Sequence, residues 1–204
     1  MTSTQLRKDA ARNWERIVAI ARDLVDQGTP LQLNDIARRA GLGVATVYRH
    51  FATPEALLET VAARCLEALV AHGERALADT DPRRALEGVL YRLVEAQVTD
   101  AALPPIAAAA TDALPRTTEL ERSLASTGTT LLERARQAGA IRADLTAADL
   151  VPLMCGIAHA VTVHGGAPRR TGRHRPPLPR HPARRHAPHP GLSVPTGRRE
   201  GRNP

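Results

Sequence analysis

The stretch from residue 31 to residue 51, LQLNDIARRAGLGVATVYRHF, decides the fold of this chain. It contains two short runs with the apolar spacing of helices, 33–40 and 44–50, and Gly41 and Gly43 lie between them. Two short helices joined by a glycine-containing turn form a helix-turn-helix. We expect Gly41 to adopt a positive φ angle, which costs glycine little. The sequence therefore predicts a DNA-binding head.

The second helix of this motif, 44–50, is expected to contact DNA. Its apolar side fills the gap to the first helix, and its other side chains then face outward, within reach of a major groove. The predicted DNA-binding residues are Val44, Ala45, Thr46, Tyr48, Arg49 and His50, with Thr53 just after the helix. Arg49 can donate two hydrogen bonds to guanine or be a solvated charge. Tyr48 and His50 contact DNA in the favoured interpretation and pack on a neighbouring helix in the alternative.

Helical signals continue along the chain to about residue 164. Hydrophobic residues make up 43% of the chain and aromatic residues only 2%, and the apolar content is mostly Ala, Leu and Val, which favours helices over strands. Thr53-Pro54-Glu55 and Asp81-Pro82 are helix starts with a capping residue followed by proline. The predicted helices are about 8–27, 33–40, 44–50, 54–78, from 82 onward, 117–138 and 146–164, with 100–115 left unassigned. The fold is predicted to be all-α.

The net charge of +7 is concentrated at the C-terminal end. Residues 165–204 contain ten Arg and one Glu, whereas the preceding part of the chain sums to −2. The same tail contains nine Pro, six Gly and four His, so we expect it to be disordered. It is either a nucleic-acid-binding arm or a frame-shifted, non-native C-terminus, and its composition favours the frame shift. Bulk charge alone therefore does not establish DNA binding.

Other classes of protein find little support in the sequence. No signal peptide and no membrane-spanning run is evident, and a cytoplasmic protein with reduced thiols is expected. Cys155 and His159 lie four apart on one helix, but no second ligand pair or orienting group accompanies them. We therefore predict no metal, no cofactor and no enzymatic activity. Trp14 and Phe51 are expected in the core.

The motif resembles the tetracycline-repressor (TetR) family of one-component regulators. The resemblance covers residues 12–58 and rests on Asp35-Ile36-Ala37, Ala40-Gly41, Thr46-Val47-Tyr48-Arg49-His50-Phe51 and Glu55-Ala56-Leu57-Leu58. Gln32 and Gly43 stand where the family usually has a Ser or Thr cap, and Pro54 stands where it usually has Lys. By resemblance, the chain forms a homodimer that places two recognition helices in successive major grooves, about 34 Å apart.

The resemblance also implies how the chain is divided and regulated. A DNA-binding head (1–52) is followed by a helical ligand-binding and dimerisation domain (53–164) and by the tail (165–204). A small-molecule effector is expected to release the repressor from its double-stranded DNA operator. Candidate ligand-binding residues, chosen as polar or adaptable groups in apolar helices, are His72, Tyr91, Glu95, Met154 and His159. Of these, Tyr91 and Met154 are expected to line a cavity.

Dimerisation depends on the last predicted helix and on the tail that follows it. The helix at 146–164 supplies an apolar face, but the tail is unsuited to extend it, and stable interfaces bury about 1,200–2,000 Å². The apolar face consists of Leu150, Leu153, Ile157 and Val161. We therefore expect a monomer or a weak dimer. The alternative function is a defective or heterodimerising regulator subunit that lacks its final dimerisation helix.

Overall fold

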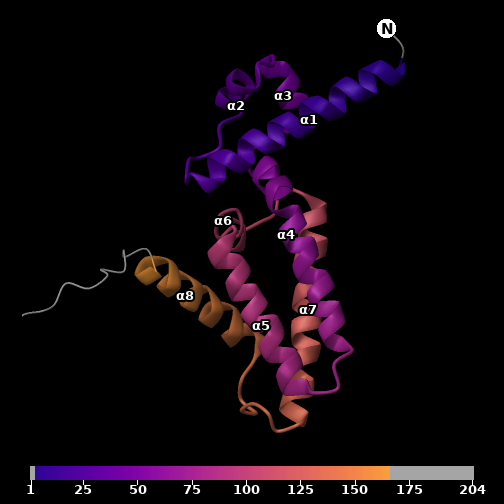
Figure 1. Cartoon of the computed structure of the whole chain (residues 1–204). Helices are drawn as coiled ribbons and strands as arrows, with labels where there is room; N and C mark the ends of the chain where they lie inside the picture. Colours follow the sequence, from indigo (N-terminus) through magenta and orange to yellow (C-terminus); the bar gives the residue numbers. More distant parts are fainter. Residues whose placement is uncertain (1–2, 166–204) are drawn as a thin grey trace, which may run out of the picture. The chain divides into compact units, whose positions relative to one another are not determined.

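The computed structural model describes residues 3–165, which form eight α-helices and contain no strand (Figure 1). In chain order they are α1 (Ser3–Asp26), α2 (Leu33–Ala40), α3 (Val44–His50), α4 (Pro54–Leu77), α5 (Pro82–Thr99), α6 (Leu103–Ala107), α7 (Pro115–Gln137) and α8 (Ala147–Gly165). The all-α prediction is confirmed. The predicted disordered tail lies outside the described residues.

Helices α1, α2 and α3 form the head, which we define as residues 3–52. Its apolar residues recur every three or four positions and therefore share one face of each helix. The most deeply buried of them, each at most 2% exposed, are Ile17, Ala21, Leu24, Ile36, Ala37 and Val47. Helix α1 ends before Gly28, whose φ is +67°. There the amides of Gly28 and Thr29 donate to the carbonyls of Val25 and Leu24, as in a Schellman motif.

Helix α4 belongs to both parts of the described chain. Thr53 starts it by accepting a hydrogen bond from the Ala56 amide at 3.1 Å, with Pro54 in the first helical position. Leu57 and Val61, near its start, lie in the same apolar cluster as Ile17 of the head. Because that cluster continues along α4, the head and the following helices share one core.

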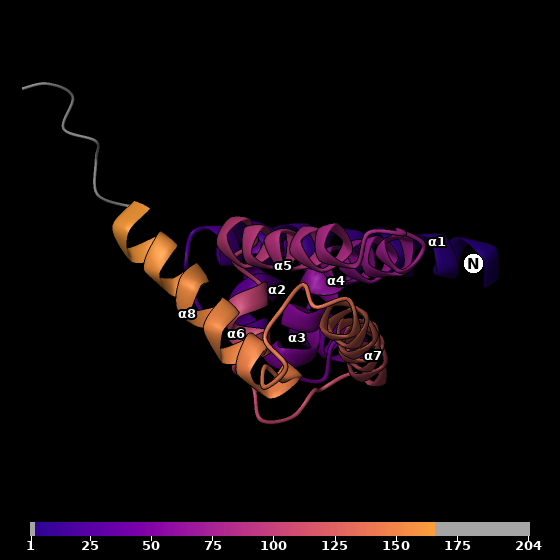
Figure 2. The ribbon, with the colours of Figure 1, turned by 90° about the horizontal axis from the view of Figure 1, so that it is seen from below.

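The body, which we define as residues 53–165, is built around α4, α5 and α7, which lie side by side (Figures 1 and 2). The start of α7 is fixed by Glu59 of α4, which is 4% exposed. Its carboxylate accepts hydrogen bonds from the amides of Ala113 at 2.6 Å and Leu114 at 2.8 Å. Helix α8 packs on α5, and both views show it extending away from the other helices.

The predicted helix boundaries agree with the structure where a capping or stop residue marks them. The two helices of the motif match residue for residue, and Asp81 accepts hydrogen bonds from the amides of Arg83 and Arg84, as a cap does. Thr146 precedes α8, and its hydroxyl and amide both donate to Asp149. Helix α1 begins earlier than predicted, at Ser3. Helix α6 was missed because it is short and lacks a side-chain cap.

Candidate DNA-binding surface and ligand cavity

Helix α3 exposes the face that the sequence assigns to DNA. Val44 is 47% exposed and Tyr48 is 48% exposed, although both are large side chains. Ala45 and Arg49 are also exposed, whereas Thr46 and His50 are half-buried. Arg49 donates a hydrogen bond to the Thr46 hydroxyl at 3.1 Å. Since Val47 is fully buried, the helix is anchored on one side and free on the other.

The turn between α2 and α3 is held by backbone geometry. Gly41 has a φ of +62°, as predicted, and the Leu42 amide donates to the Ala37 carbonyl at 2.9 Å. Arg16 of α1 donates to the Ala40 carbonyl at 3.1 Å and so fixes the end of α2. These bonds satisfy carbonyls that the end of a helix leaves unpaired. The angle between α2 and α3 is therefore set by groups on α1, on α2 and in the turn itself.

The two atypical cap positions behave as expected from their side chains. Neither Gln32, before α2, nor Gly43, before α3, provides a side-chain hydrogen bond to its helix. The DNA-binding helix thus begins without the acceptor that Ser or Thr would supply. Thr53 is the exception, because its hydroxyl caps α4. Its predicted contact with DNA would use an atom that already has a structural role.

Aromatic packing beside α3 corrects one prediction. Phe51 is 5% exposed, as expected for a core residue, but Trp14 is 41% exposed. Trp14 stacks on Phe51 with the ring centroids 6.4 Å apart, and this contact buries only part of the Trp14 side chain. The prediction that Trp14 is a core residue is wrong. His50 also lies beside Phe51, with centroids 6.4 Å apart, which gives its ring a packing role in addition to any contact with DNA.

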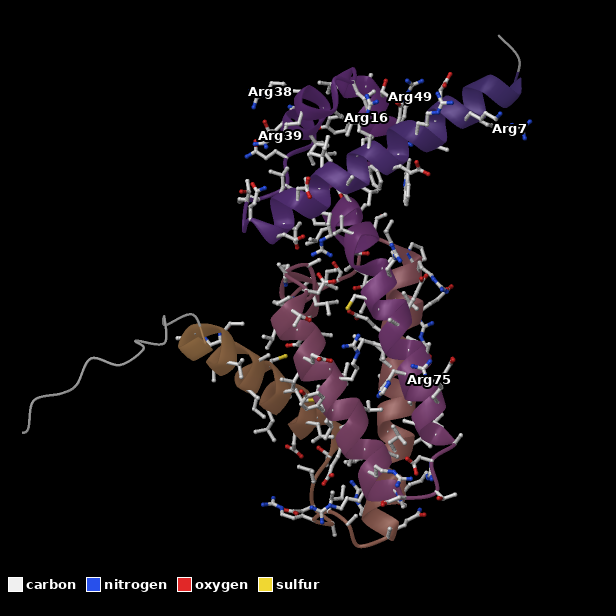
Figure 3. All side chains as sticks on the ribbon, in the orientation of Figure 1. Arg7, Arg16, Arg38, Arg39, Arg49 and Arg75 are labelled. Atoms are coloured by element: carbon white, nitrogen blue, oxygen red, sulfur yellow. The ribbon has the colours of Figure 1, made fainter. Side chains whose placement is uncertain are left out.

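Basic side chains surround this surface. Arg38 and Arg39 project from the outer side of α2, and Arg7 lies near the start of α1 (Figure 3). Asp35 pairs with both Arg38 and Arg39, and the bond from Arg38, followed by that from Arg39, lowers the pKa of Asp35. The Arg38 side chain nevertheless remains 80% exposed. Exposed arginines beside a protruding helix suit the phosphates that flank a groove.

A cavity of about 350 Å³ lies inside the body. Residues from α4, α5, α6, α7 and the first half of α8 line it, and most of them are aliphatic. Its polar side chains include Gln97, Glu121, Thr127 and Thr129. This volume and this mixture of apolar wall and few polar groups are typical of small-molecule sites.

The structure distributes the predicted ligand-binding residues unevenly. Met154 lines the cavity, whereas His159 lines a second pocket with Gln97 and Cys155. Tyr91 is 73% exposed and does not line the cavity, so that prediction is wrong. It lies on the outer face of α5. Glu95 pairs with Arg92 on the same helix, and neither Glu95 nor His72 belongs to the cavity wall.

The polar residues of the cavity were missed from the sequence, Gln97 and Glu121 among them. Gln97 lies on α5 and lines both the cavity and the second pocket, and Glu121 lies on α7. Glu121 shares a helix face with Leu124, Ala125 and Gly128, since these positions follow it by three, four and seven. A carboxylate on a helix face of small and apolar residues is the sequence signal that could have identified Glu121 as a cavity residue.

An ion pair joins the head to the segment between α5 and α6. Arg22 of α1 donates to Asp100 at 2.7 Å, and the two side chains are 31% and 17% exposed. Burial opposes ionisation of Asp100, but the bonds from Arg22 and from the Ala102 amide outweigh it and lower the pKa of Asp100. Asp100 lies between α5 and α6, and both helices line the cavity. The segment that connects these two cavity-lining helices is thus bonded to the head.

The described part of the chain shows neither a metal site nor a membrane-spanning helix. It contains no group of three or more His, Cys, Asp or Glu side chains arranged to hold a metal ion. Cys155 instead accepts a long hydrogen bond from Gln97, with the nitrogen and sulfur 3.8 Å apart. Among residues 3–165, none of the helices combines the length and the apolar character needed to cross a membrane.

These features define a helix-turn-helix DNA-binding protein, and comparisons with known proteins identify its family. Residues 17–61 match the family model of bacterial regulatory proteins of the tetR family, and residues 81–174 match that of the SbtR-like transcriptional regulator C-terminal domain. A TetR transcription regulatory protein from Mycobacterium vanbaalenii is 31% identical, with 78% of this chain and 98% of that chain covered and a TM-score of 0.45. The chain belongs to the TetR family of transcriptional regulators.

A curated relative matches part of the chain, and a second solved structure shares its fold. An HTH-type transcriptional regulator of Staphylococcus aureus strain USA300 is 38% identical over 69 residues, which is 33% of this chain and 37% of that protein. The match to this curated relative therefore spans about 37% of its length. The fatty acid degradation regulator FadR from Bacillus halodurans has the same fold, with a TM-score of 0.53 at 15% identity over 74% of this chain and 88% of that chain.

Proposed function

We propose that this regulator is a repressor that binds its operator as a homodimer and leaves it when a small molecule occupies the body cavity. The ion pair between Arg22 and Asp100 carries this proposal, because it joins the segment between two cavity-lining helices, α5 and α6, to the head through partly buried charges.

Helix α3 is proposed to enter the major groove of the operator. Tyr48, Thr46 and His50 would position the helix against phosphates, and Arg49 would contact a guanine edge. Val44 and Ala45 would lie against the bases, since they are exposed at the start of the helix. Support comes from the burial of Val47 on the opposite side of α3, which leaves these side chains available.

Helix α8 is proposed to meet α8 of a second copy. Leu153, Ile157 and Val161 are 55%, 52% and 45% exposed, and their spacing of four places them on one face. Water contact with such a continuous apolar stripe is unfavourable, so a partner surface would stabilise it. One helix from each subunit makes a small interface, and we therefore expect the dimer to be weak.

Release is proposed to begin at the loop between α5 and α6. A ligand in the cavity would touch Gln97 on one side of Asp100 and Leu103 on the other. Any shift of these residues moves Asp100, and Arg22 would carry that shift to α1. Release then requires that the ligand bind the state with displaced heads more tightly than the DNA-binding state.

Selection of DNA sequences bound by the full chain from a random pool tests the operator part. We expect an inverted repeat with half-sites about one helical turn apart. Light scattering over a range of concentrations tests the dimer, and Ile157→Glu should shift the mass toward the monomer. A pool that yields single half-sites, together with a mass that Ile157→Glu leaves unchanged, would contradict the homodimer.

A further inference from the structure

The cavity of about 350 Å³ has an asymmetric wall. Most of its lining is aliphatic, as with Leu66, Leu93 and Met154. Glu121 is the ionisable side chain of the lining, and among the described residues that form it there is no Lys, Arg or His. A ligand that fills this space would therefore meet one negative group and a largely apolar surround.

Glu121 itself lacks a partner within the described chain. It is half-buried on α7, and it forms no ion pair or hydrogen bond with any described residue. Burial, followed by the charges of Asp112 and Glu59, raises the pKa of Glu121. A carboxylate that loses water without gaining a donor is unfavourable, and a ligand that supplies a donor or a positive charge would relieve this cost.

The carboxylates near Glu121 are already satisfied. Glu59 accepts the amides of Ala113 and Leu114, and Asp112 accepts a hydrogen bond from the Thr118 hydroxyl at 2.7 Å. Glu59 and Asp112 therefore add negative potential near Glu121, but their own carboxylates already accept hydrogen bonds from other groups. The second polar group, Gln97, uses its amide nitrogen toward Cys155, which leaves its carbonyl oxygen as an acceptor. Both Gln97 and Glu121 thus favour a ligand that donates hydrogen bonds.

We propose that the cavity binds an amphipathic organic cation, with its positively charged, hydrogen-bond-donating head against Glu121 and its apolar part along the leucines of α4 and α5. This inference rests on the proposed function in taking the cavity as the effector site. A carboxylate ligand, such as a free fatty acid, is the opposite case, since its head group would repel Glu121 in a wall without a compensating cation.

Three probes with the same ten-carbon tail separate these cases: decylamine, which is an ammonium ion at neutral pH, decan-1-ol and decanoate. Binding to the full chain is measured by calorimetry in the absence of DNA. We expect decylamine to bind about tenfold or more tightly than decan-1-ol, because a hydrogen bond to a charged group adds at least that much. Decanoate should bind most weakly.

Variants assign the selectivity to one side chain. Glu121→Gln should remove most of the preference for decylamine and leave the affinity for decan-1-ol within about twofold. Glu119→Gln is the matched control, because Glu119 lies on the same helix with a side chain that is 61% exposed. Gly128→Leu should weaken all three probes, since Gly128 lines the cavity and a Cβ there has no neighbour within 4 Å.

Two results would overturn the inference: decanoate binding as tightly as decylamine, or a preference for decylamine that Glu121→Gln leaves unchanged. Operator release is measured separately, by adding decylamine to the protein–DNA complex. Binding that depends on Glu121 without release of DNA would support the cation site and contradict effector-controlled repression. Release of DNA by decanoate alone would support the regulatory proposal and contradict the cation site.

Discussion

The head and the body of this regulator both contain fully buried apolar side chains, but the helices of the body also surround a cavity. In the head, Ile17, Ile36 and Val47 are each 0% exposed, and the turn between α2 and α3 is fixed by backbone hydrogen bonds. In the body, five helices surround a cavity, and one of its wall residues is a half-buried carboxylate without a partner. Close packing holds a single geometry, whereas a cavity allows its walls to adjust to an occupant.

This difference suits the two tasks of a regulator. The DNA-binding part must present α3 in one orientation, because hydrogen bonds to base edges tolerate little displacement. Under the proposed function, the body must change when its cavity is occupied, and elements of low local stability are the ones that move in such transitions. The Arg22–Asp100 pair lies where these two kinds of packing meet.

The largest expected effect concerns packing itself. Ile17→Ala in the head should lower the free energy of unfolding by about 2–5 kcal/mol, as for other fully buried aliphatic residues. Leu90→Ala in the body should cost about half of that or less, because Leu90 already borders the cavity and is only partly buried. Urea denaturation of the two variants measures the difference. Equal losses would mean that the body is packed as tightly as the head.

The next effect concerns α3. Arg49→Ala should cost about 1–3 kcal/mol of operator binding and relax the preference at one base position, if the contact is bidentate. Tyr48→Ala should instead weaken binding to all sequences without changing the preference. Selection from a random pool with each variant distinguishes the two roles. An unchanged base preference in Arg49→Ala would assign that arginine to phosphate or solvent.

A smaller effect is expected at the junction between head and body. Asp100→Asn keeps the size of the side chain but removes its charge, so the change in operator affinity caused by decylamine should shrink. Coupling between sites is typically about 1–3 kcal/mol, which sets the upper limit of this loss. Arg83→Ala is the control, since it removes an exposed ion pair between Arg83 and Glu87, which both lie on α5. Coupling that survives in Asp100→Asn would place the transmission elsewhere.

The same pair predicts a pH dependence. Because the pKa of Asp100 is lowered in the folded chain, its contribution to stability is present above the ordinary aspartate value of about 3.9 and is lost as the pH falls through the lowered value. Asp100→Asn should therefore reduce the acid sensitivity of unfolding below about pH 4. Thermal melting as a function of pH measures this, and parallel curves for the wild-type and variant chains would exclude a role for Asp100.

The smallest effect concerns the cap of α3. Gly43→Ser should stabilise the chain by a few tenths of a kcal/mol, roughly the difference between Gly and Ser at a cap. The substitution fits, because Gly43 has a φ of −64° and a Cβ there would meet only the Thr46 hydroxyl, at 3.8 Å. Urea denaturation and operator binding measure the change. A loss of stability would show that the start of α3 does not accept a side-chain cap.

The sequence by itself determined the helix-turn-helix and most of the helix boundaries. The helices at 33–40 and 44–50, the positive φ of Gly41 and the caps at Thr53 and Asp81 were all predicted from neighbouring residues. These features depend on interactions within a few positions of the chain, such as a capping oxygen or a residue without a Cβ. Local sequence is therefore sufficient to specify them.

Only the tertiary structure decided which side chains form the cavity and which remain exposed. Leu66, Glu121 and Met154 line one cavity although they lie far apart in the sequence, whereas Tyr91 points outward from a helix that also lines it. Trp14 was misjudged for the same reason. Helical periodicity shows which residues share a face, but it does not show what that face meets, because this depends on how separate helices pack together.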